Sequence, residues 1–233
     1  MSTESFPFVA ALLASILHVI AGPDHLAAVI PFAIESKRKA WKIGLFWGIG
    51  HLLGMIIIGV LFLIFRELIP VEKISGYSEQ LVGVVLIFIG FWAFYKLFKS
   101  SKRHKHLHVH ANDDVAIHKH EHEHHKSHNH SHHHDGVKQS NLASLSVGFL
   151  HGLAGIAHFL LFIPVASFDN RMDSVMYLLG FAAGIVIAMT AFALVVGRIS
   201  AFAKNEHNDM LFKGIRLAGG LFAIIIGIYW MTL

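Results

Sequence analysis

Apolar stretches separated by short polar connections occupy most of the chain, and one long polar segment interrupts them near the middle. A helix that crosses a bilayer needs about 20 predominantly apolar residues. Six stretches reach that length, at 6–34, 41–65, 77–98, 142–168, 175–196 and 211–231. Because a spanning segment must satisfy its own backbone hydrogen bonds, the pattern predicts an all-α integral membrane protein with six transmembrane helices.

The first and fourth stretches are longer than the others and contain glycine and proline. These interruptions are Gly22, Pro23 and Pro31 in the first stretch, and Gly152, Gly155 and Pro164 in the fourth. They free backbone amide and carbonyl groups at membrane depth, which is tolerated only where protein or a polar cavity satisfies those groups. We therefore expect helices 1 and 4 to be broken beside a polar interior.

An internal repeat relates the two halves of the chain. A shift of 133 residues places His18 and His25 over His151 and His158, and a shift of 137 relates the third stretch to the sixth. Each half then holds three spans, so the halves insert in opposite directions, as in many secondary transporters. The alternative is that glycine and proline only aid helix packing. The predicted domains are 1–98 (first repeat), 99–140 (polar loop) and 141–233 (second, inverted repeat).

The distribution of lysine and arginine predicts the orientation. Of the 19 basic residues, 16 lie in or beside the first, third and fifth connections, which leaves Arg66, Lys73 and Arg171 for the other side. Basic residues collect on the cytoplasmic side of membrane proteins. We therefore expect a multi-pass protein of the cell membrane, with both termini outside and the polar loop in the cytoplasm.

Composition narrows the chemistry further. Hydrophobic residues make up 55% of the chain and charged residues 15%, which favours a bilayer as the solvent. The chain has no cysteine, which excludes disulfides, thiolate metal sites and cysteine nucleophiles. The phosphate-binding motif G-x-x-x-x-G-K-[ST] does not occur in the sequence, so ATP-driven chemistry of that type is not expected.

Six ionisable residues fall near the middle of the predicted spans. They are His18, Asp24, His25, His51, His151 and His158. An aspartate at the bilayer centre costs about 2.5–3.5 kcal/mol, so such residues usually mark a transport pathway. His18 and His25 are two helical turns apart, and His151 and His158 repeat that spacing. We expect five imidazoles and one carboxylate to face a shared cavity.

This combination of groups predicts a metal site. Imidazole and carboxylate together suit Ni, Co, Zn, Fe or Mn, and suit Cu(I) less, because Cu(I) prefers sulfur. Two alternatives remain open. Each histidine alone can be explained by a hydrogen bond to a neighbouring helix, and chains of His and Asp also relay protons.

The polar loop is rich in histidine, with 14 of them between His104 and His134. It has few large apolar residues, so we expect it to be disordered and to bind metal weakly at many alternative positions. It would collect ions for export, buffer incoming ions or sense load, unless it is only a spacer. The H-E-x-x-H match at 120–124 is expected by chance in such a tract and indicates no protease.

The string His18-Val-Ile-Ala-Gly22-Pro23-Asp24-His25-Leu-Ala-Ala, with His151-Gly-Leu-Ala-Gly155 in the second half, resembles the UreH-like branch of the NicO-like nickel/cobalt transporter superfamily. The resemblance covers the hydrophobic chain outside the loop. It implies transport of nickel or cobalt, with His18, Asp24 and His25 as the metal-selecting residues. The better-known nickel permeases have H-x4-D-H where this chain has five intervening residues, and the long loop resembles efflux members.

The leading hypothesis is a secondary transporter of Ni²⁺ or Co²⁺ with no resident cofactor, and not an enzyme. A membrane oxidase is disfavoured, because such enzymes need fixed histidines at cytosolic helix ends. The alternatives are a metal-binding accessory or sensor protein, or efflux of Zn, Mn or Fe. Expected partners are the ion, the bilayer, a cytoplasmic metallochaperone or urease and hydrogenase maturation proteins, and a second copy of the chain, but no nucleic acid.

Overall fold

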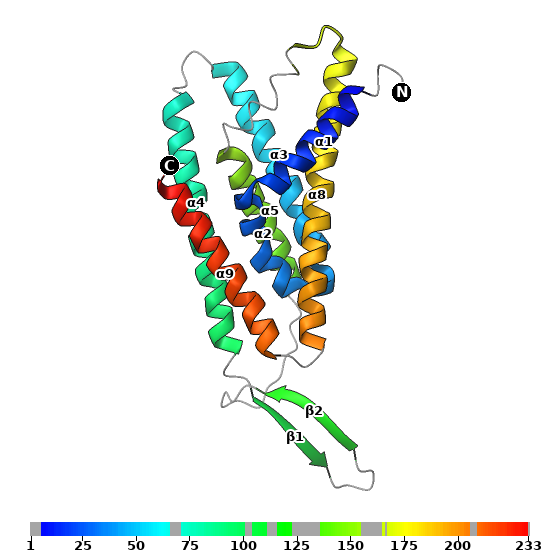
Figure 1. Ribbon diagram of the computed structural model, residues 1–233, viewed down its shortest axis with the longest axis vertical. Coiled ribbons are helices and arrows are strands. Elements are labelled where there is room, and N and C mark those ends of the chain that lie inside the picture. Colours follow the sequence, from blue (N-terminus) through cyan, green and yellow to red (C-terminus); the bar gives the residue numbers. More distant parts are fainter. Residues whose placement is uncertain are drawn as a thin grey trace.

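Long helices run side by side through most of the molecule (Figure 1). The computed structural model describes residues 6–65, 71–100, 104–110, 116–122, 136–154, 165, 167–205 and 209–232. Its elements are α1 (Phe6–Ala21), α2 (Pro23–Ser36), η2 (Lys37–Lys39), α3 (Ala40–Phe65), α4 (Val71–Ser100), β1 (His104–His110), β2 (Ala116–His122), α5 (Gly136–Ala154), α8 (Arg171–Asn205) and α9 (Asp209–Thr232). The helical nature of the membrane part is as predicted.

Four helical segments of the described chain are long and apolar enough to cross a membrane. They are Pro23–Val60, Glu79–Lys99, Arg171–Lys204 and Met210–Thr232. The first of them contains α2 and most of α3, and α1 is a shorter apolar helix. Large apolar side chains such as Phe88 and Phe98 point outward, about 70% exposed, as expected of a surface that faces lipid. The protein is therefore a multi-pass membrane protein.

The first predicted span is broken at Gly22, as expected. Gly22 has extended backbone dihedrals (φ −86°, ψ 99°), and Pro23 begins the next helix at a position where a missing N–H costs nothing. The amide of Gly22 still donates to the carbonyl of His18 at 3.0 Å, which keeps the two helices joined end to end. The break predicted in the fourth span at Gly155 and Pro164 falls on residues outside the described part, whereas Gly152 lies within α5 and Pro31 lies within α2, so neither interrupts its helix.

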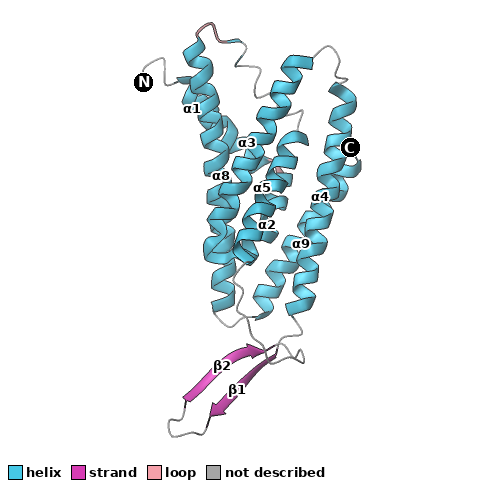
Figure 2. Ribbon diagram, turned by 180° about the vertical axis from the view of Figure 1, so that it is seen from behind, coloured by secondary structure: helices cyan, strands magenta, loops and turns pink. Residues whose placement is uncertain are grey.

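Three closely packed helix pairs form the core: α3 with α5, α4 with α9, and α1 with α8. The α4–α9 pair can be seen in both views (Figures 1 and 2). In the α3–α5 pair, glycines bring the two backbones into direct contact. A side chain at Gly148 would collide with the carbonyl of Trp47, and one at Gly152 with the carbonyl of His51. Glycine at these two positions therefore lets α5 lie directly against the turn of α3 that carries His51.

Within the histidine-rich loop, the described residues include two strands. β1 and β2 pair antiparallel, with His104 opposite His122, His106 opposite His120 and His108 opposite His118. The physical reason lies in the alternation His-Lys-His-Leu-His-Val-His, whose Leu107 and Val109, with Ile117 across from Val109, favour a strand. The ordered helices also reach further into the predicted loop than expected, since α4 ends at Ser100 and α5 begins at Gly136.

Candidate metal centre

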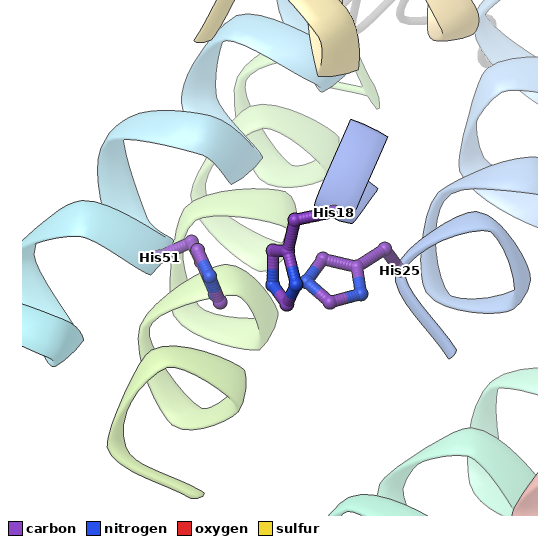
Figure 3. A group of neighbouring side chains, drawn as sticks. All are labelled: His18, His25 and His51. Atoms are coloured by element: carbon purple, nitrogen blue, oxygen red, sulfur yellow. The ribbon is translucent and has the colours of Figure 1, made fainter. Parts of the chain in front are cut away.

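Four helices bring the predicted polar residues to one point inside the bundle. His18 lies in the last turn of α1, Asp24 and His25 in the first turn of α2, His51 in α3 and His151 in the last turn of α5. Figure 3 shows the rings of His18, His25 and His51 pointing toward one another. Five of the six predicted residues are thus together, and the sixth, His158, lies outside the described residues.

The break at Gly22 produces this convergence. In an unbroken helix His18 and His25 would be stacked two turns apart, about 10 Å along the axis. Here α2 begins directly after α1, and the two ring centroids are 4.9 Å apart at an interplanar angle of 84°. The ring of His25 is also 5.2 Å from that of His51 and 4.8 Å from that of His151. His25 is therefore the central residue of the cluster.

Asp24 organises two of the imidazoles. Its Oδ1 lies 3.0 Å from Nδ1 of His25, and its Oδ2 lies 2.9 Å from Nε2 of His151. An ionised carboxylate only accepts hydrogen bonds, so both rings donate an N–H to it. In a neutral ring the other nitrogen then carries a lone pair, which is the arrangement that carboxylates impose on metal-binding histidines. Asp24 thus orients the ligands and supplies negative charge.

Two overlapping ligand sets result. His18, His25 and His51 form one set, and Asp24, His25 and His151 form the other, with the candidate ligand atoms of each set within 4.8 Å of one another. Two nitrogens bound to one ion with bonds of about 2.1 Å are at most about 4.2 Å apart. Small side-chain rotations therefore bring either set into coordinating distance, and His25 belongs to both.

Four of the five residues of the cluster are buried, and His18 is half-buried. His51 is fully buried, His25 is 2% exposed, and Asp24 and His151 are 5% and 4% exposed. A pocket between α2, α4 and α5 reaches His151, and its other walls are apolar, including Ala28, Val82 and Leu86. Burying this many polar groups costs free energy unless a partner of suitable charge interacts with them. These groups could therefore hold a metal ion.

Sequence reasoning missed one component, Trp47. Its indole stacks on His51 (centroids 4.9 Å apart, 14° between planes) and lies 5.5 Å from the ring of His25 and 5.4 Å from that of His151. Trp47 is fully buried, so it forms a fixed apolar wall against which the three imidazoles pack. The signal was its position four residues before His51, which places both residues on one face of a helix.

Comparison with known proteins agrees with a membrane role. Residues 6–229 match the family model described as "Cytochrome C biogenesis protein transmembrane region". The chain is 28% identical over 217 residues to chloroplast protein FOR GROWTH AND FERTILITY 1 of Arabidopsis thaliana, covering 93% of this chain and 56% of the relative. It is 27% identical over 216 residues to FOR GROWTH AND FERTILITY 2 of the same plant, covering 92% and 53%.

A third relative is closer in length. The chain is 30% identical over 215 residues to urease accessory protein UreH of Bacillus sp. (strain TB-90), which covers 90% of this chain and 83% of the relative. By contrast, the chain spans about half the length of the two chloroplast relatives. No solved structure matches the chain.

Proposed function

The chain belongs to the cytochrome C biogenesis protein transmembrane region family, in a UreH-like membrane group, and from this premise we propose that it is a secondary transporter of a divalent transition-metal ion. Ni²⁺ and Co²⁺ are the first candidates. The name of the urease accessory relative supports them, as does the resemblance of the Gly22-Pro23-Asp24-His25 string to the UreH-like branch of the nickel/cobalt transporters. The ion is the cargo of this site.

The observation that carries the proposal is the set of three buried imidazoles, one buried carboxylate and the half-buried His18, drawn from α1, α2, α3 and α5. A single buried histidine is explained by a hydrogen bond to a neighbouring helix, but this cluster concentrates five costly groups at one point. Nitrogen-rich coordination with one carboxylate suits borderline divalent ions. Because His25 serves both sets, an ion moves from one to the other by exchanging the remaining ligands.

An inverted-repeat architecture forms part of the proposal, and the glycines of α4 and α9 support it. A side chain at Gly83 would collide with the carbonyl of Gly227, and one at Gly90 with the carbonyl of Gly220. Adding 137 to the positions of Gly83 and Gly90 gives Gly220 and Gly227, so the first contact maps onto the second. Such reciprocity is expected of two halves related by a two-fold axis.

From the distribution of basic residues we also propose that both termini lie outside the cell and that the β1–β2 hairpin lies in the cytoplasm. The second candidate is an accessory or sensor protein that binds metal and transfers it to a cytoplasmic partner. The observation in its favour is the ordered β1–β2 segment, whose strands carry seven histidines beside the bundle. Efflux of Zn, Mn or Fe is a variant of the transport proposal and is resolved by the same experiment.

The test is the cellular content of Ni, Co, Zn, Mn and Fe by elemental analysis. Cells carry the wild type, His25→Ala, the hairpin control His106→Ala, or vector alone. We expect one metal to depart from the vector level with the wild type and with His106→Ala, and to return to it with His25→Ala. A gain identifies import, and a loss with resistance identifies export. Equal metal content in all four strains would reject the transport proposal.

A further inference from the structure

We propose that the end of the bundle formed by η2, the end of α8 and the start of α9 binds the phosphate of an anionic phospholipid. Three cations surround the ring of Phe212 there, and each comes from a different element. Arg216 of α9 has its guanidinium carbon 4.5 Å from the ring centroid, whereas Nζ of Lys37 is 5.8 Å and Nζ of Lys204 is 5.9 Å from it. We call these three cations the basic cluster.

The basic cluster has three cations but only one carboxylate partner among the described residues. Glu35 pairs with Arg216, with Nη2 of the arginine 2.7 Å from one carboxylate oxygen and 2.9 Å from the other. No other carboxylate of the described chain forms a salt bridge with Lys37 or Lys204. Nε and Nη1 of Arg216 are buried and have no hydrogen-bond partner. Two positive charges and two buried donors are thus uncompensated, which is unfavourable unless an anion binds nearby.

The backbone around the cluster is held in place. Lys37 adopts φ 50° and its amide donates to the carbonyl of Ala33, which ends α2. A side chain at Gly197 would collide with the carbonyl of Lys37, so α8 lies directly against this turn. The hydroxyl of Ser200 donates to the carbonyl of Ile34 at 2.8 Å. Because these contacts fix the turn before any ligand arrives, the ordering cost of binding is small.

The surroundings favour a lipid over a soluble anion. The end of α8 and the start of α9 lie at the end of the bundle from which the hairpin extends (Figure 1). Phe202, Met210 and Leu211 flank the cluster along the chain and are 63%, 84% and 44% exposed. Acyl chains would cover these side chains while the headgroup phosphate meets the lysines. Basic pockets between membrane helices bind anionic headgroups in this way.

The test measures lipids retained by the full-length protein. The protein is purified from nanodiscs of phosphatidylcholine with phosphatidylglycerol, and bound lipids are counted by native mass spectrometry. We expect the wild type to retain phosphatidylglycerol selectively. Lys37→Gln and Lys204→Gln should each weaken retention about fivefold. The matched control is Arg198→Gln, which removes one exposed charge from the same end of α8 and should retain the lipid as the wild type does.

Two further arms make the outcomes decisive. Inorganic phosphate is added to the nanodiscs as a competitor, and it should not displace the lipid. Size-exclusion profiles confirm that each variant is folded. Unchanged retention in both lysine variants, or an equal loss in Arg198→Gln, would overturn the site. Displacement by inorganic phosphate would replace the lipid with a soluble anion. None of these readouts depends on metal transport.

Discussion

Histidines occur in two settings that have little in common. In the candidate metal centre, a hydrogen bond to Asp24 and ring contacts with residues of α1, α3 and α5 hold His25 in place. Residues distant in the chain therefore determine its position. In the hairpin, seven histidines are placed only by strand pairing between neighbouring segments. A two-stranded hairpin alone is marginally stable in water, whereas the packed bundle holds its groups in one arrangement.

Under the transport proposal, this difference in rigidity assigns the selection of an ion to the metal centre and the collection of ions to the hairpin. A site that discriminates between metals needs ligands at fixed distances, because each metal demands its own geometry. A flexible array of imidazoles binds many ions weakly. We therefore expect changes to the buried centre to alter whether and which ion moves, and changes to the hairpin to alter how much metal the protein holds.

The largest effect should follow from separating the helices that form the centre. Gly152→Leu places a side chain against the carbonyl of His51, where neither backbone can move away, and should cost about 3 kcal/mol in stability. Transport into proteoliposomes should fall to background, with a lowered melting temperature in detergent. The matched control is Gly59→Leu on α3, where the added side chain meets open space. Equal damage in both would contradict a specific role for the α3–α5 contact.

The next largest effect concerns the carboxylate. Asp24→Asn keeps the shape but removes the charge that offsets the ion and accepts from two rings. Removing such an orienting partner typically weakens metal affinity between ten- and a hundredfold. Isothermal titration with Ni²⁺ and Co²⁺ measures it, and Asp173→Asn at the start of α8 is the control. Wild-type affinity in Asp24→Asn would show that the carboxylate only fills space.

A smaller effect is expected at the wall of the centre. Trp47→Leu removes the ring stacked on His51, whereas Trp47→Phe keeps an aromatic face. Looser imidazoles should weaken Ni²⁺ binding about tenfold in the leucine variant and reduce its preference for one metal over another. The phenylalanine variant should stay near the wild type. Competition titrations between Ni²⁺ and Zn²⁺ supply the measurement. Identical selectivity in all three proteins would show that Trp47 does not influence metal binding.

The smallest effect tests the hairpin without changing its composition. The double variant H106L/L107H moves one histidine by a single position, which transfers it to the other face of the strand, out of register with His120. Total metal bound per protein should fall by less than about twofold, and transport at saturating metal should not change. Equilibrium dialysis followed by elemental analysis measures the capacity. A collapse of transport would assign the hairpin to the pathway itself.

The sequence was informative where a local rule applied. The Gly22-Pro23 pair predicts the break, and the spacing of His18 and His25 places both beside it, as the structure shows. The contact of Asp24 with His151 spans 127 residues and depends on how α2 packs on α5, which no local pattern contains. In the loop, composition predicts disorder, which stays a prediction, whereas the alternation His-Lys-His-Leu-His-Val-His is typical of a strand and corresponds to β1.

The basic residues show the same limit. Lys37, Lys204 and Arg216 served to predict orientation, because the number of charges near a span suffices for that purpose. Their convergence on Phe212 depends on the packing of η2 and α8 against α9, which brings together positions nearly 180 residues apart. Counting charges near the spans therefore yields a prediction of orientation, which stays a prediction, but it does not indicate that these three side chains meet.

The break at Gly22 also gives the centre an electrical polarity. Aligned peptide dipoles place roughly half a negative charge at the last turn of α1 and half a positive charge at the first turn of α2. Asp24 stands in that first turn and masks the positive end, while the negative end of α1 stays beside His18. Two half-helices meeting head to tail thus present a cation with an attractive field on both sides of the junction. An anion would meet repulsion there before it reached any imidazole.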